Sequence, residues 1–123
     1  MSKKILIADD EENIVTALEF LLARKGYQVL IARNGATVLP MVEAHRPDLV
    51  LLDVMMPAQS GYDVCRRLRE RAEWRAIKIV MLTAKGGERE ASKGIDAGAD
   101  CYVTKPFSTQ ELVTRIDGLL AGP

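Results

Sequence analysis

The chain has 123 residues, of which 48% are hydrophobic and 28% charged, and its 17 basic and 17 acidic side chains leave no net charge. This composition is typical of a globular domain and excludes collagen-like, coiled-coil and disordered chains. A neutral total argues against the broad basic surface that direct nucleic-acid binding requires, and no apolar run approaches the length of a membrane span. We therefore expect a cytoplasmic protein without membrane contact.

Short apolar runs alternate with longer helical patterns along the chain. Five runs are strand-like, at residues 4–8, 27–32, 49–52, 77–82 and 101–104. The third is continuously apolar, as a strand covered on both faces must be, whereas the second and fifth carry polar residues and suit the edges of a sheet. The alternation predicts five βα units, hence an α/β fold and a single domain over residues 1–123.

Apolar residues recur at helical spacing between these runs. One stripe lies within residues 14–22 and another within 112–120, and each predicts a helix with one buried face. Ser108 followed three residues later by Glu111 forms a capping box before the last helix, and Ser60 begins a third helix in a similar way.

Two helical patterns are irregular. Residues 88–97 are mostly charged and contain Gly94, which costs about 1 kcal/mol relative to alanine, so we expect the most mobile helix there. Pro40 falls inside the second helical pattern, residues 34–46, where its ring should clash with the carbonyl of Ala36. We predict a kink at this proline.

Charged and polar side chains stand where the strands end. Right-handed crossovers place the carboxyl ends of all strands at one edge of a parallel sheet, where ligands bind in folds of this class. The first strand is followed by Asp9 and Asp10 and the third by Asp53. The fourth ends in Thr83, and the fifth precedes Lys105. Three carboxylates, a hydroxyl and an ammonium thus converge at one place.

Three carboxylates this close together cannot all stay ionised without a partner. Two of them about 4 Å apart repel by roughly 4 kcal/mol at an effective dielectric constant near 20. Either one takes a proton or a divalent cation binds, and hard oxygen ligands suit Mg²⁺. With Mg²⁺ bound, Asp53 becomes a plausible nucleophile towards a phosphoryl group. Thr83 and Lys105 could then donate to the oxygens of the aspartyl phosphate.

Five motifs, present in order over essentially the whole chain, resemble the receiver domain of bacterial two-component response regulators. They are Ile5 to Ala8 before Asp9-Asp10, Asp53-Val54-Met55-Met56-Pro57, Gly61, Thr83-Ala84, and Tyr102 before Lys105-Pro106-Phe107. The resemblance implies a three-layer α/β/α, flavodoxin-like fold whose parallel sheet has the order 2-1-3-4-5. It also implies a switch activated by phosphorylation, which has only self-phosphorylating and self-dephosphorylating activity and is not an enzyme in the usual sense.

The same resemblance implies how the phosphoryl group is received. Asp53 is the phosphoacceptor, and its donor is a phosphohistidine on a sensor histidine kinase or a phosphotransfer protein. Asp9, Asp10, Asp53 and the backbone carbonyl of Met55 would hold the Mg²⁺ ion.

The resemblance further implies how the switch responds. Thr83 and Lys105 hold the phosphoryl group, Tyr102 moves inward when Thr83 is drawn towards it, and the bond between Lys105 and Pro106 is a cis peptide. The surface of residues 88–121 then changes and alters partner binding.

Part of that surface suggests pairing between two copies. Four charged positions resemble those through which receivers of winged-helix transcription regulators dimerise, namely Lys93, Asp100, Glu111 and Arg115. Cys101 departs from that subfamily, which usually has a second Asp there. Whether the chain is a stand-alone regulator or part of a longer protein stays open.

Each of these residues also has an ordinary structural interpretation. Asp9 and Asp10 could cap the first helix, and Asp53 could end a strand before a turn. Lys105 could be a solvated loop residue. Both cysteines, the single histidine and the single tryptophan are interpreted as structural.

Two other function classes fit less well. An aspartate-nucleophile phosphatase of the haloacid dehalogenase type, the main alternative, would resemble D-x-D on the first strand, where this chain has adjacent aspartates. A flavin carrier would need a glycine- and hydroxyl-rich phosphate loop after the first strand, where this chain has four acidic residues in succession.

Overall fold

The computed structural model describes residues 2–83 and 96–121. The helices and strands of these residues are β1 (Lys4–Ala8), α1 (Glu12–Arg24), β2 (Gln28–Ala32), α2 (Val38–His45), β3 (Leu49–Asp53), α3 (Gly61–Glu70), β4 (Lys78–Thr83), β5 (Cys101–Thr104) and α5 (Thr109–Leu120). Short 3₁₀ turns span Gly35–Thr37 and Ala72–Trp74. The helix expected over residues 88–97 lies, except for its last two residues, outside the described part of the chain.

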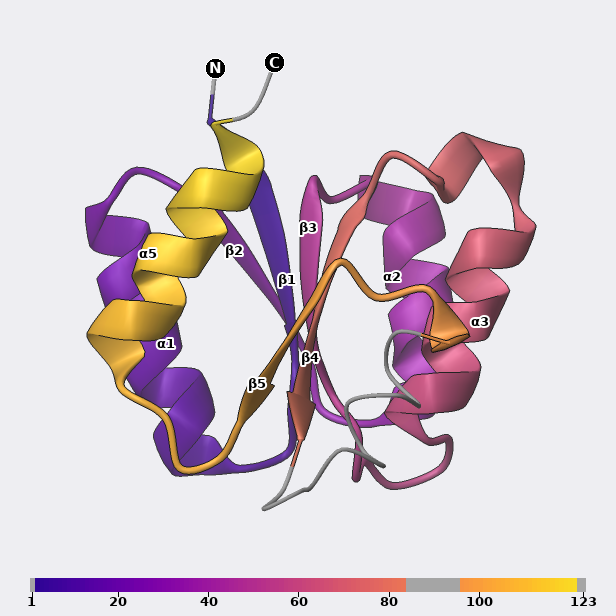
Figure 1. Ribbon diagram of the computed structural model, residues 1–123, viewed down its shortest axis with the longest axis horizontal. Helices are drawn as coiled ribbons and strands as arrows, with labels where there is room; N and C mark the ends of the chain where they lie inside the picture. The colour runs from indigo at the N-terminus through magenta and orange to yellow at the C-terminus, as the bar shows by residue number, and fades with distance from the viewer. Residues whose placement is uncertain (1, 84–95, 122–123) are drawn as a thin grey trace.

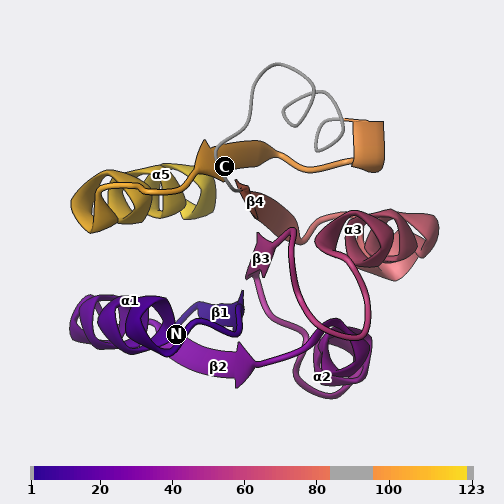
Figure 2. The ribbon, with the colours of Figure 1, turned by 90° about the horizontal axis from the view of Figure 1, so that it is seen from below.

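The strands pair in parallel in the order β2-β1-β3-β4-β5, with β2 and β5 at the edges. Helices α1 and α5 cover one face of this sheet, and α2 and α3 cover the other, as Figure 1 shows. Seen from below in Figure 2, the molecule has three layers, and the strands point towards the viewer. The predicted fold class, sheet order and edge strands are confirmed.

Successive residues of the central strands face opposite helical layers. In β1, Ile5 and Ile7 belong to the core under α1 and α5, whereas Leu6 and Ala8 belong to the core under α2 and α3. All five residues of β3 are buried. Because full burial of one large aliphatic side chain contributes about 1.5–3 kcal/mol, these two cores fix the strands and hence the positions of their ends.

Two of the helices begin as their capping residues predict. Ser108 Oγ accepts a hydrogen bond from the Glu111 amide at 3.2 Å, and Ser60 Oγ accepts one from the Asp63 amide at 3.3 Å. Helix α1 begins differently, since its N-cap residue is Glu11, whose side chain makes no capping hydrogen bond.

The prediction for Pro40 was wrong. The segment 34–46 is divided into a 3₁₀ turn and a helix that starts at Val38, so Pro40 lies in the first turn of α2. The first four amides of a helix have no intrahelical acceptor, and a proline there removes no hydrogen bond. The error came from extending one helical pattern across a boundary that the 3₁₀ turn marks.

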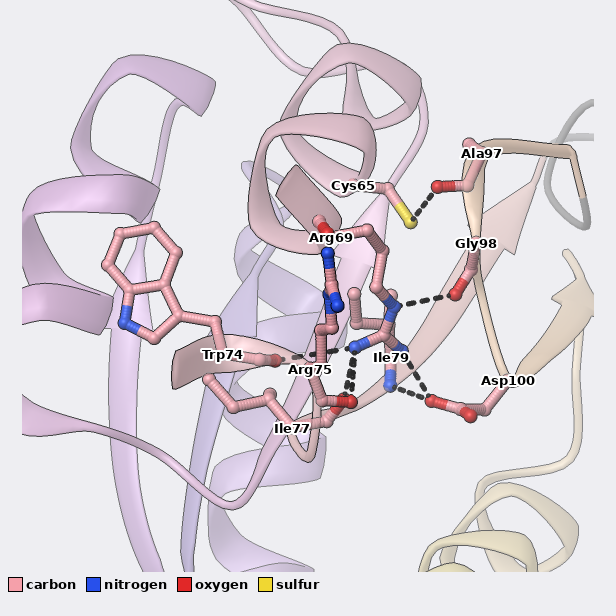
Figure 3. Close-up of polar contacts among 9 residues, drawn as sticks. All are labelled: Cys65, Arg69, Trp74, Arg75, Ile77, Ile79, Ala97, Gly98 and Asp100. Carbon is pink, nitrogen blue, oxygen red and sulfur yellow. Dashed lines mark hydrogen bonds and ion pairs between the residues drawn. The ribbon is translucent and has the colours of Figure 1, made fainter. Parts of the chain in front are cut away.

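A network around Arg69 ties α3 to the chain that precedes β5 (Figure 3). The guanidinium donates to the carbonyl of Gly98 at 2.9 Å, to that of Ile77 at 2.8 Å and to Asp100 Oδ2 at 2.8 Å. The same Asp100 oxygen accepts the amide of Ile79 at 2.8 Å. These contacts fix the start of β5 beside β4, and no sequence motif predicted them.

The loop after β3 requires a residue without a side chain. A Cβ atom at Gly61 would lie 2.5 Å from the carbonyl oxygen of Asp53, so the first turn of α3 packs directly against the backbone at the end of β3. At Gly118, in contrast, a Cβ atom would meet nothing within 4 Å.

These two helical glycines predict opposite effects of the same substitution. Gly61→Ala should lower the free energy of unfolding by about 2 kcal/mol, because the backbone of Asp53 must move to make room. Gly118→Ala, at an exposed position of α5, should raise it by up to about 1 kcal/mol, because alanine has the higher helix propensity. Urea unfolding measures both, and a Gly61→Ala variant as stable as the parent would contradict the packing described.

Candidate functional site

Four strands end at the edge of the sheet that faces the viewer in Figure 2. Asp53 and Thr83 are the last residues of β3 and β4, while Asp9 follows β1 and Lys105 follows β5. The Lys105 amide donates to the Thr83 carbonyl at 2.7 Å, which joins the ends of β4 and β5. The sheet therefore brings together the side chains that the sequence analysis singled out.

Three carboxylates form the floor and rim of this site. Asp9, Asp10 and Asp53 each offer one oxygen, and these atoms lie within 4.8 Å of one another. Asp9 and Asp53 are 0% and 3% exposed, whereas Asp10 is exposed. Oxygen ligands open to solvent on one side are what Mg²⁺ requires, because it keeps several of its waters. The triad is capable of binding a metal ion.

The ammonium of Lys105 lies beside the triad. Its Nζ atom is 3.2 Å from Asp9 Oδ2, 3.4 Å from Asp53 Oδ2 and 2.9 Å from Glu11 Oε1. Burial lowers the pKa of Lys105, but the hydrogen bond to Glu11 and the charges of Asp53 and Asp9 outweigh it, so the pKa is raised. Lys105 is thus held as a cation.

Asp9 is the member of the cluster whose pKa is raised. Burial, together with the charge of Asp53, raises the pKa of its carboxyl group in spite of the opposing effects of the Glu11 amide and Lys105. The charged form of Asp9 is therefore disfavoured until a further cation arrives.

Two buried oxygens at the site have no hydrogen-bond partner among the described residues. They are Asp9 Oδ2, which lies near Lys105 but outside hydrogen-bond geometry, and Thr83 Oγ1. Buried polar atoms are nearly always paired, so these two fit a site completed by a bound group. A cation would satisfy the carboxylate oxygen, and a phosphoryl oxygen would accept from the hydroxyl.

Local turns aim the two buried carboxylates. Asp53 Oδ1 accepts the amide of Met55 at 3.1 Å, and Asp9 Oδ1 accepts the amide of Glu11 at 2.9 Å. Both are bonds to the residue two positions ahead, which aspartate makes readily at the end of a strand. The side chain of Met55 itself is 72% exposed.

The residues expected to transmit the switch lie around β5. Tyr102 is 37% exposed, so its ring lies at the surface. The peptide bond between Lys105 and Pro106 is cis. Arg115 of α5 donates to Cys101 Sγ at 3.2 Å.

Three of the four residues of the expected dimer face, Asp100, Glu111 and Arg115, line one pocket beside β5 and α5, and the pairing of two copies stays a prediction. Asp100 is bound by Arg69 within the chain, and Glu111 lies in the first turn of α5. Lys93 lies outside the described residues.

One residue of the site was missed by the sequence analysis. Glu11 was counted only as part of an acidic run, yet its carboxylate makes the shortest contact to Lys105. One feature of the sequence could have indicated this role: Glu11 stands directly before a helix, at the position where a short polar side chain usually caps the helix.

Comparison with known proteins places the chain in a family. A family model described as the response regulator receiver domain matches residues 5–117. The alkaline phosphatase synthesis transcriptional regulatory protein PhoP of Bacillus subtilis is 46% identical over 120 residues, which are 98% of this chain and 49% of PhoP. The chain thus spans about half the length of this curated relative.

Solved structures agree with this match. DrrB of Thermotoga maritima, an OmpR/PhoB homologue, has a TM-score of 0.88 at 33% identity, covering 98% of this chain and 54% of DrrB. The receiver domain of the sensor histidine kinase PA1611 of Pseudomonas aeruginosa, which has a magnesium ion coordinated in its active-site cleft, has a TM-score of 0.89 at 27% identity, covering 99% and 100% of the two chains.

The chain belongs to the response regulator receiver domain family. It is a phosphorylation switch rather than an enzyme in the usual sense, as its sequence motifs implied. Within the described residues, no helix is both long and apolar enough to cross a membrane.

The raised pKa of Asp9 predicts how stability depends on pH. Because the charged form is disfavoured in the folded chain, the free energy of unfolding falls as the pH rises through the ordinary value of 3.8 and on through the raised one. Asp9→Asn removes this penalty, so in metal-free buffer near pH 7 it should raise the free energy of unfolding by about 1 kcal/mol or more.

Thermal unfolding at two pH values measures the effect. The gain should vanish near pH 3, where the carboxyl group is protonated in both folded and unfolded chains. Asp10→Asn, at an exposed position, is the control and should gain clearly less. A gain for Asp9→Asn that persists at low pH would contradict this electrostatic explanation.

Proposed function

We propose that Asp53 accepts a phosphoryl group from a phosphohistidine in a Mg²⁺-dependent reaction. The observation that carries the proposal is the meeting of three carboxylate oxygens within 4.8 Å of one another, beside the ammonium of Lys105. The relative from Pseudomonas with magnesium in its cleft supports the choice of metal.

The ligands proposed for the ion are the carboxylates of Asp9, Asp10 and Asp53 and the backbone carbonyl of Met55. The Met55 amide donates to Asp53 Oδ1 at 3.1 Å, so the backbone of the residue that carries this carbonyl is held near the carboxylate. A bound Mg²⁺ would offset the carboxylate charges and draw phosphoryl oxygens to the site.

The chain's own residues then carry the transfer. An oxygen of the Asp53 carboxylate attacks phosphorus, the bond from phosphorus to the donor nitrogen breaks, and the electron pair leaves with the imidazole. The Lys105 ammonium and the Thr83 hydroxyl donate to the phosphoryl oxygens and stabilise the charge that develops on them. No proton needs to be removed from the nucleophile, which agrees with a site that contains no histidine.

The product is a chain with one new charged group at the sheet edge. An aspartyl phosphate adds about −1.5 to −2 charges, and the Thr83 hydroxyl, which has no partner among the described residues, is the natural donor to it. We propose that Thr83 turns towards the phosphoryl group and that the ring of Tyr102 moves inward. The change would alter the surface of residues 88–121.

The partners proposed are a sensor histidine kinase or a phosphotransfer protein as donor. A second copy of the chain, bound through the 88–121 surface, stays a prediction. Asp100 pairs with Arg69 through one oxygen of its carboxylate, which leaves the second oxygen for a contact with another copy.

The proposal predicts that Asp53→Asn abolishes labelling by acetyl phosphate in the presence of Mg²⁺, because the amide cannot act as the nucleophile. Asp63→Asn, which changes an exposed aspartate of α3, is the matched control and should label as the parent does. Intact-mass spectrometry measures the added phosphoryl group, and equal melting temperatures establish that each variant is folded.

Labelling also separates the switch from the phosphatase alternative. A switch should reach about one phosphoryl group per chain, which then decays slowly, whereas a phosphatase would release phosphate continuously without accumulating label. Full labelling of Asp53→Asn would overturn the assignment of the nucleophile.

A further inference from the structure

The carboxylate of Glu11 holds Lys105 although Glu11 belongs to neither the acidic triad nor the phosphoryl-binding set. Glu11 is the N-cap residue of α1, in extended conformation. Its amide donates to Asp9 Oδ1, and its carbonyl accepts the amide of Val15 at 3.0 Å. The backbone of Glu11 is therefore fixed on both sides, and its side chain is free to reach Lys105.

Three carboxylates lie near the Lys105 ammonium, but among the described residues only the contact to Glu11 has hydrogen-bond geometry. Glu11 Oε1 at 2.9 Å is closer than Asp9 Oδ2 at 3.2 Å or Asp53 Oδ2 at 3.4 Å. An ammonium has three donors and no more. A phosphoryl group on Asp53 would add strong acceptor oxygens that compete with the present contacts for the ammonium.

The exposure of the three carboxylate side chains indicates which of them loses the Lys105 ammonium most easily. The side chains of Asp9 and Asp53 are 0% and 5% exposed, and each is held by a backbone amide. The side chain of Glu11 is 55% exposed, so water can replace Lys105 as its partner. Loss of the ammonium therefore costs least at Glu11.

We propose that Glu11 is a positioning residue that holds the Lys105 ammonium in the resting chain and must release it when Asp53 is phosphorylated. Glu11 thereby lowers the affinity of the site for a phosphoryl group. The proposal rests on the function proposed above, because it needs Lys105 to bind the phosphoryl oxygens.

Glu12 provides a matched control. It is the next residue, it is also an exposed glutamate, and its carboxylate pairs with Arg33 instead of Lys105. A change to glutamine removes the same charge at both positions. A difference between the two variants therefore reports the contact with Lys105 rather than the general field of the acidic loop.

The test is a titration with beryllofluoride, an analogue of the phosphoryl group, at saturating Mg²⁺, followed by NMR. Glu11→Gln should tighten binding by about threefold, the size expected from release of a half-exposed ion pair. Glu12→Gln should leave the dissociation constant unchanged. In the resting protein, Glu11→Gln should also shift the Nζ resonance of Lys105, whereas Glu12→Gln should not.

Glu11→Asp separates contact from charge. Its carboxylate is one methylene shorter and is suited to cap α1, so it keeps the charge but should lose Lys105. We expect it to bind beryllofluoride as Glu11→Gln does.

Three results would overturn the proposal: an unchanged or weaker affinity for Glu11→Gln, equal tightening by Glu12→Gln, or parental affinity for Glu11→Asp. A failure of the proposed function is distinguishable, because the parent chain itself would then not bind beryllofluoride.

Discussion

Mutual repulsion among carboxylates that the sheet forces together is the constraint on which the rest of this molecule depends. The two hydrophobic cores fix β1 and β3 side by side, and a buried aspartate follows β1 and another ends β3. Neither Asp9 nor Asp53 can move apart from the other without disturbing packing. The repulsion between these carboxylates therefore lowers the free energy of unfolding, and a bound cation would offset it.

Lys105 moderates this repulsion without removing it. Its ammonium contacts the two buried aspartates and Glu11, so one positive charge is shared among three negative ones. Such a site is capable of binding a metal ion, and its ammonium is a donor that a phosphoryl group can use. The hydroxyl of Thr83 on the neighbouring strand, which has no partner in the part of the chain that the structure describes, is a second such donor.

Much of the fold and of the site could be predicted because both follow from local patterns. The apolar runs end sharply at Asp9 and Asp53, so strand ends and site residues are read from the same positions. What could not be predicted depends on side-chain reach between distant segments. Glu11 contacts Lys105, which is 94 positions away in the sequence. Arg69 donates to backbone carbonyls of turns whose conformation no motif predicts.

Calorimetric titration of the metal-free chain with Mg²⁺ tests most directly whether Asp9, Asp10 and Asp53 share one cation. We predict saturable binding of one ion per chain, weakened at least about tenfold by Asp10→Asn, whose exposed position leaves the core intact. Absence of saturable Mg²⁺ binding to the folded chain, or equal affinity of the Asp10→Asn variant, would contradict it.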